Sequence, residues 1–115
     1  MGEEWFSLTW RPKVLKQYSS TVETLDVNLL NEEVLSNIFS VEDITTDRRV
    51  GYIEGPKGLE GIAQKVAGKE NSAAFILHPV TWDEFLEITN EGTTLPPKST
   101  WFEPRMKNGV IVYGY

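Results

Sequence analysis

The sequence predicts an α/β or α+β fold in which helices pack on a mixed sheet, with the elements in the order β-α-β-α-β-α-β-β. Residues 4–10 place β-prone side chains with a period of two, as a half-buried strand does. Residues 73–77 form a continuous apolar run between polar turns, which is typical of a strand covered on both faces. Other segments repeat apolar residues every three to four positions, the spacing of amphipathic helices. We therefore expect residues 1–115 to form a single domain.

The first strand stops at Arg11-Pro12, and residues 12–20 follow as a polar loop. Asp26 is a suitable N-cap for the first helix. That helix has a wide apolar face, made of Val27, Leu30, Val34 and Ile38 and broadened by Leu29, Leu35 and Phe39. We expect this face to lie in the core rather than in the groove of a partner.

A second strand is expected at residues 49–54, and the sequence Gly55-Pro56 ends it. The second helix starts with Pro56 near its first position and ends at Gly68. Its apolar face consists of Leu59, Ile62, Ala63 and Val66. The buried strand at residues 73–77 comes next and would be the centre of the sheet.

Thr81 and Glu84 have the spacing of a capping box, which predicts the start of a third helix. Its apolar side chains are Trp82, Phe85 and Ile88, with Leu86 beside them, and Gly92 ends it. Two short strands at residues 101–103 and 110–113 are expected to close the fold, with Asn108-Gly109 as the turn between them.

Composition and charge restrict the possible functions. The formal net charge is −6, which disfavours a general nucleic-acid-binding surface because such a surface needs a positive field. The absence of cysteine excludes disulfides, thiolate catalysis and cysteine-ligated zinc. No apolar run approaches the ~18 residues of a membrane span, and the first residues lack the features of a signal peptide. We expect a cytoplasmic protein without a membrane partner, cofactor or metal.

The only histidine, His78, lies at the end of a predicted strand, where ligands gather in α/β proteins, but a lone histidine is more commonly a structural polar residue. Residues 55–61 are rich in glycine and precede a helix, which superficially suits phosphate binding. Their spacing matches no phosphate loop, and Pro56 removes one N–H donor, so turn formation is the simpler interpretation.

The best candidate for a site is the segment Pro96-Pro97-Lys98-Ser99-Thr100, because the two prolines restrict the backbone before an ammonium group and two hydroxyls. With Arg105 as a bidentate donor, Lys98, Ser99 and Thr100 could bind an anion or a phosphate. From Gly92 onward the local charge is +2, against −8 for the preceding residues. The aromatic pair that follows, Trp101 and Phe102, equally suits core packing, so the segment could instead only close the fold.

The same residues resemble the domain-of-unknown-function 1015 family. The resemblance rests on Leu25-Asp-Val, on Ala74-Phe-Ile-Leu-x-Pro79-Val, and most sharply on Leu95-Pro-Pro-Lys-Ser-Thr-Trp-Phe-Glu-Pro-Arg105-x-x-x-Gly109-Val. Leu95 stands where that family has methionine, and Arg105 where it has lysine. The resemblance implies that the chain is the C-terminal fragment of a longer protein. Members often occur beside serine-biosynthesis enzymes, which suggests a small phosphorylated or amino-acid ligand.

Three functions follow as hypotheses. The first is a binding or regulatory domain of a larger metabolic protein that recognises a small anion or a phosphorylated metabolite. The second is a part of a phosphotransferase-like enzyme whose other residues lie in the missing N-terminal part, with no activity expected for this chain alone. The third is a purely structural domain. The expected partners are that N-terminal part and, through Trp5, Trp10 and Tyr18, a second copy in a weak homodimer.

Overall fold

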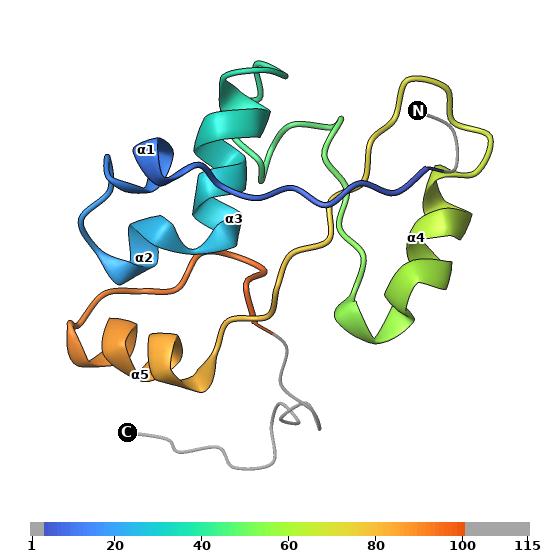
Figure 1. The fold of residues 1–115 in the computed structure, drawn as a ribbon. Coiled ribbons are helices and arrows are strands. Elements are labelled where there is room, and N and C mark those ends of the chain that lie inside the picture. The colour runs from blue at the N-terminus through green and yellow to red at the C-terminus, as the bar shows by residue number, and fades with distance from the viewer. Residues whose placement is uncertain (1–3, 101–115) are drawn as a thin grey trace, which may run out of the picture.

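The structure is a computed structural model that describes residues 4–100, and it is helical. Figure 1 shows short helices joined by long connecting segments, with α4 apart from the other helices. The elements in chain order are α1 (Pro12–Leu15), α2 (Thr21–Thr24), α3 (Asp26–Leu29), the π-helix η1 (Leu30–Ser36), the 3₁₀-helix η2 (Gly55–Lys57), α4 (Gly58–Val66) and α5 (Trp82–Asn90).

The predicted mixed sheet is wrong, because residues 4–100 contain no strand. The segments at residues 4–10, 49–54 and 73–77 run as connecting chain (Figure 1). An apolar alternation describes one chain segment, whereas a strand also needs a neighbouring backbone to complete its hydrogen bonds. The run at residues 73–77, expected to be buried on both faces, is exposed throughout. The strands predicted at residues 101–103 and 110–113 lie outside the described residues.

The core lies where α2, α3, η1 and α5 meet, since α2 packs on both α3 and α5, and α3 on η1. Its buried apolar residues are Leu25, Leu29, Leu30, Val34, Val41 and Ile88. Leu29 and Ile88 are the most fully enclosed, with 0% and 1% of their surfaces exposed. The expected core role of the first helix is therefore confirmed for its first half, at Leu29, Leu30 and Val34.

The second half of that helix does not face the core as predicted. The Phe39 N–H donates to the Val34 carbonyl at 3.2 Å, a bond that spans five residues, as π-helices do. A π-helix has more residues per turn than an α-helix, so an apolar stripe spaced for 3.6 residues per turn rotates away from the core. Ile38 and Phe39 are accordingly 68% and 45% exposed.

The stretch at residues 12–20, predicted to be a loop, carries α1 and leads into α2. Pro12 opens α1, where its missing N–H costs nothing. Ser20 caps α2 through a capping box: its hydroxyl accepts from the Glu23 N–H at 3.4 Å, and the Glu23 carboxylate accepts from the Ser20 N–H at 3.1 Å. The same bonds, together with one from the Ser19 N–H, lower the pKa of the Glu23 carboxyl, with the Ser19 bond as the largest cause.

Two aromatic side chains link the N-terminal residues to α3 and η1 by hydrogen bonds. The indole Nε1 of Trp10 donates to the Asp26 carboxylate at 2.9 Å. The Tyr18 hydroxyl donates to the Glu33 carboxylate at 2.9 Å, a bond that is the main cause of a raised Tyr18 pKa. Of the three residues expected to be an exposed dimer surface, Trp5 alone is more than half exposed. Asp26 itself lies in α3, and Leu25 takes the predicted N-cap position.

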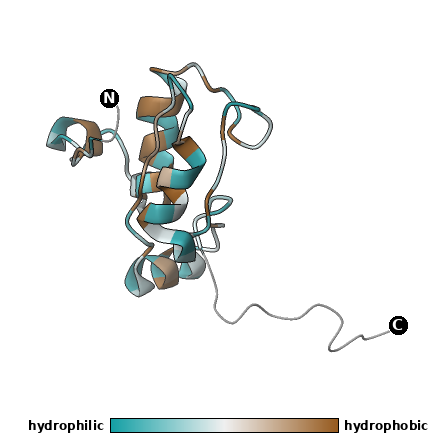
Figure 2. Cartoon of the chain, turned by 90° about the vertical axis from the view of Figure 1, so that its right-hand side faces the viewer, coloured by the Kyte–Doolittle hydropathy of each residue, from teal (hydrophilic) through white to brown (hydrophobic). Residues whose placement is uncertain are grey.

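The second and third predicted helices are confirmed as α4 and α5. Pro56 lies in η2 directly before α4, and Gly68 follows α4 with a φ of 71°. Thr81 and Glu84 form both halves of the predicted capping box at α5, and Gly92 follows that helix with a φ of 69°. Figure 2 shows that hydrophobic positions continue from the helices into the connecting segments.

Candidate functional site

The segment that carries most of the predicted site residues forms a tight turn after α5. Ser99 donates twice to the Pro96 carbonyl, from its N–H at 3.3 Å and from its hydroxyl at 2.7 Å. Pro97 and Lys98 are therefore the two central residues of the turn. Lys98 has a φ of 65°, and a positive φ after a proline is the signature of a type II turn.

Lys98 occupies a position that usually belongs to glycine or asparagine, because a β-carbon is strained at positive φ. The residue is exposed and makes no salt bridge or side-chain hydrogen bond within residues 4–100. Among residues 4–100, the Lys98 ammonium at the tip of the turn therefore has no charged or hydrogen-bonding partner. Residues other than glycine that are held at a positive φ cluster at functional positions.

The other predicted site residues have different surroundings. Ser99 is half-buried, and both of its donors are used inside the turn, so its hydroxyl oxygen remains only as an acceptor. Thr100 is exposed beside it, with its hydroxyl available to solvent. Arg105 lies outside the described residues. Within the described part, the structure therefore brings together one ammonium group and one hydroxyl from the predicted set.

A second cluster of charged side chains borders a surface pocket of about 300 Å³ beside the start of α4. Lys57 and Lys65 contribute ammonium groups to its lining, and Tyr52 and Ile53 contribute apolar surface. Glu54 also lines the pocket, and its carboxylate pairs with the Lys57 ammonium at 2.8 Å. Sequence analysis missed the pocket because the connection that precedes η2 was interpreted as a strand. The sequence feature that could have indicated the pocket is the interval of four residues from Lys57 to Gly61 and again from Gly61 to Lys65.

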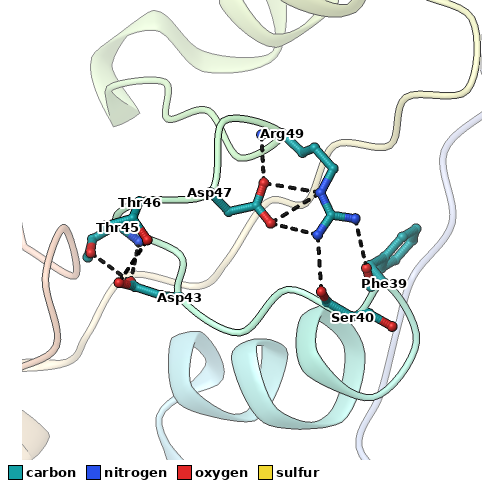
Figure 3. Close-up of polar contacts among 7 residues, drawn as sticks. All are labelled: Phe39, Ser40, Asp43, Thr45, Thr46, Asp47 and Arg49. Carbon is teal, nitrogen blue, oxygen red and sulfur yellow. Dashed lines mark hydrogen bonds and ion pairs between the residues drawn. The ribbon is translucent and has the colours of Figure 1, made fainter.

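Arg49, predicted to start a strand, instead ties the chain back to the end of η1 (Figure 3). Its guanidinium donates to the carbonyls of Phe39 at 3.1 Å and Ser40 at 3.0 Å, which lie just past the helix end where carbonyls lack partners. It also pairs with the Asp47 carboxylate at 2.6 Å and thereby lowers the pKa of the Asp47 carboxyl. These contacts are structural, because the Arg49 guanidinium is engaged by the Asp47 carboxylate and by the Phe39 and Ser40 carbonyls.

Asp43 makes a similar local cluster on the same connection (Figure 3). One carboxylate oxygen accepts from the Thr45 hydroxyl at 2.6 Å and from the Thr45 N–H at 2.8 Å, and the other accepts from Thr46 at 2.9 Å. These bonds, first that of the Thr45 hydroxyl, lower the Asp43 pKa. An acid or base for catalysis needs a pKa near the working pH, so a carboxylate held ionised in this way does not suit that role.

The remaining candidates from the sequence form neither a metal site nor a phosphate loop in the described part of the chain. His78 is exposed, and residues 4–100 hold no cluster of three potential metal-ligating side chains. Residues 55–61 form the turn from η2 into α4, where Gly58 has a φ of 55°, so turn formation accounts for two of the three glycines. No helix in the described part of the chain is long and apolar enough to cross a membrane.

Comparison with known proteins gives no match to any family model, to any curated protein or to any solved structure. The resemblance of the Pro96–Thr100 turn and its surroundings to the domain-of-unknown-function 1015 family stays a prediction.

Proposed function

We propose that this chain is a cytoplasmic binding or regulatory domain that recognises a small anion or a phosphorylated metabolite through the turn at Lys98. The observation that carries the proposal is the positive φ of 65° at an exposed lysine. Glycine would form this turn with less strain, so a lysine there is best explained by its ammonium group. The fragment would work with the N-terminal part of a larger metabolic protein.

In this site Lys98 supplies the charge and Thr100 supplies a hydroxyl donor. Ser99 acts indirectly: its two bonds to the Pro96 carbonyl, at 2.7 Å and 3.3 Å, fix the turn that positions Lys98. Arg105 remains a proposed bidentate donor for the same anion. One exposed ammonium contributes at most about 1 kcal/mol, whereas a Kd of 1 mM corresponds to about 4 kcal/mol, so this part of the site alone binds an anion more weakly than about 1 mM.

The test is a calorimetric titration of phosphoserine and of inorganic phosphate into the wild type and into Lys98→Gln. The variant keeps the strained backbone position and removes the charge, so we expect binding to be lost without a loss of stability. Lys69→Gln is the matched control, because Lys69 is an equally exposed lysine in the turn after α4. Equal binding by the wild type and Lys98→Gln, with ligand clearly bound, removes Lys98 from the site.

A purely structural role is the second candidate, and the bonding of Ser99 favours it. If the turn only closes the fold, Ser99→Ala costs about 1 kcal/mol because it removes the bond to Pro96, and Lys98 variants leave phosphate binding unchanged. The binding proposal expects the Ser99 substitution to weaken binding as well, since the turn then holds Lys98 less firmly. Measuring both variants by urea unfolding and by titration separates the two candidates.

A further inference from the structure

The pocket beside α4 is lined by two lysines. Lys57, Gly61 and Lys65 follow one another at intervals of four residues, and all three line the pocket. A β-carbon at Gly61 would lie 2.5 Å from the Lys57 Cβ and 3.6 Å from the Ile53 Cγ2. The first distance is far below van der Waals contact, so residue 61 has to be glycine while Lys57 and Ile53 keep their places. The glycine therefore allows Lys57 and Ile53 to lie close to the α4 backbone at the pocket wall.

The charges of the pocket are unequal. Lys57 is held by Glu54 at 2.8 Å, whereas Lys65 has no salt bridge in the described part of the chain. The pKa of the Glu54 carboxyl is lowered, first by the hydrogen bond from Lys57 and to a smaller extent by the nearby charge of Lys65. Both lysines line the same pocket as Glu54. Two cations and one carboxylate leave a net charge of +1, which one negative charge on a ligand would balance.

The pocket also has an apolar side. The Tyr52 hydroxyl donates to the Ile44 carbonyl at 3.1 Å, so the ring is tied to the preceding connection rather than free to rotate out. Ile53 is half-buried beside it. The Lys65 Cε lies 3.9 Å from where a β-carbon on Gly51 would be, which places the stem of Lys65 along the backbone that carries Tyr52. A ligand that fits would need one anionic group and a compact apolar part.

From these observations we propose that this pocket binds a small organic monocarboxylate, with its carboxylate at Lys57 and Lys65 and its apolar part against Tyr52 and Ile53. The volume of about 300 Å³ is at the lower end of the range for ligand pockets, so the ligand is no larger than a single-ring acid. A phosphate ester carries up to two negative charges and would meet Glu54 with a net excess of negative charge, which favours a carboxylate. This site is separate from the Lys98 turn and does not depend on it.

The probes for a test are benzoate, benzylamine and benzyl alcohol, which share a ring and differ in charge. Each is titrated into the full chain while backbone amide chemical shifts are followed by NMR. We expect benzoate to shift the amides of residues 52–54 and of α4, and benzylamine to leave them unchanged. Benzyl alcohol should bind more weakly than benzoate at the same amides. Equal shifts with benzoate and benzylamine, or benzoate shifts confined to other residues, overturn the proposal.

Substitutions at two pocket residues have opposite expected effects. Lys65→Gln should weaken benzoate binding by roughly threefold to fivefold, the loss of one exposed ion pair, and Lys65→Arg should keep it. Glu54→Gln should strengthen binding by a similar factor because it removes the competing carboxylate. Partial unfolding would weaken binding in both variants and cannot mimic this pattern. Lys16→Gln, at the residue that follows α1, is the control for surface charge, and unchanged affinity in Lys65→Gln contradicts the assignment.

Discussion

The core of this chain is small, so the loss of one of its central side chains should have a large effect on stability. Leu29 is 0% exposed and lies in α3 at the junction with η1. Leu29→Ala removes three carbon atoms from a fully enclosed position, and such substitutions cost about 2 to 5 kcal/mol, with larger values where the neighbours cannot collapse into the cavity. Because the free energy of unfolding of a domain is only about 5 to 15 kcal/mol, we expect Leu29→Ala to lose a large fraction of its stability and to unfold at a much lower urea concentration than the wild type.

The matched control is Leu59→Ala, since Leu59 is also a helical leucine but is 59% exposed. Leu59→Ala should lower the free energy of unfolding by less than about 1 kcal/mol, because the Leu59 side chain buries little apolar surface. Ile88→Val is the milder core variant, with Ile88 only 1% exposed and an expected cost of about 0.5 to 1.5 kcal/mol. Urea unfolding followed by tryptophan fluorescence measures all three. Equal destabilisation by the Leu29 and Leu59 substitutions would contradict the assignment of Leu29 to the core.

The remaining predictions concern polar contacts. Thr81→Ala should destabilise the fold by about 1 kcal/mol, because it removes the hydroxyl that caps α5, and Thr81→Ser should restore most of that loss in thermal unfolding. The bonds from Thr81 hold the pKa of the Glu84 carboxyl below its ordinary value, so their contribution to stability is full above that ordinary value and is lost as the pH falls through the lowered pKa. Thr81→Ala should accordingly lose less stability than the wild type between pH 7 and pH 3 in urea unfolding. Trp10→Phe should cost about 1 kcal/mol through the bond to Asp26, and an unchanged unfolding midpoint would show that this bond contributes nothing.

Local signals in the sequence predicted helices well, because a cap and the residue it bonds lie within one turn. Thr81 and Glu84 identified α5 correctly, and the equivalent pair Ser20 and Glu23 at α2 carries the same signal, although it was not used in the prediction. The sheet could not be predicted in this way. Whether an extended segment becomes a strand depends on a second segment distant in the sequence, and the alternation at residues 4–10 contains no information about that neighbour.

The candidate site was predicted in part. The sequence identified Lys98 as a charge presented by a proline-rich turn, whereas the positive φ at Lys98 and the bonding of Ser99 within the turn required coordinates. The pocket at Lys57 and Lys65 depends on the approach of Ile53 to Gly61, which a helical spacing alone does not show. The π-helical turn also rotated Ile38 out of the face that its spacing predicted, because that spacing assumes an α-helix.

The most direct test of the proposed function is the behaviour of Lys98→Gly. Glycine relieves the strain of a positive φ, worth about 1 to 2 kcal/mol for a residue with a β-carbon, and part of this gain is offset by the greater freedom of glycine in the unfolded chain. The variant should therefore be at least as stable as the wild type in urea unfolding, and it should no longer bind phosphoserine in a calorimetric titration. Undiminished phosphoserine binding by a stable Lys98→Gly variant would contradict the account.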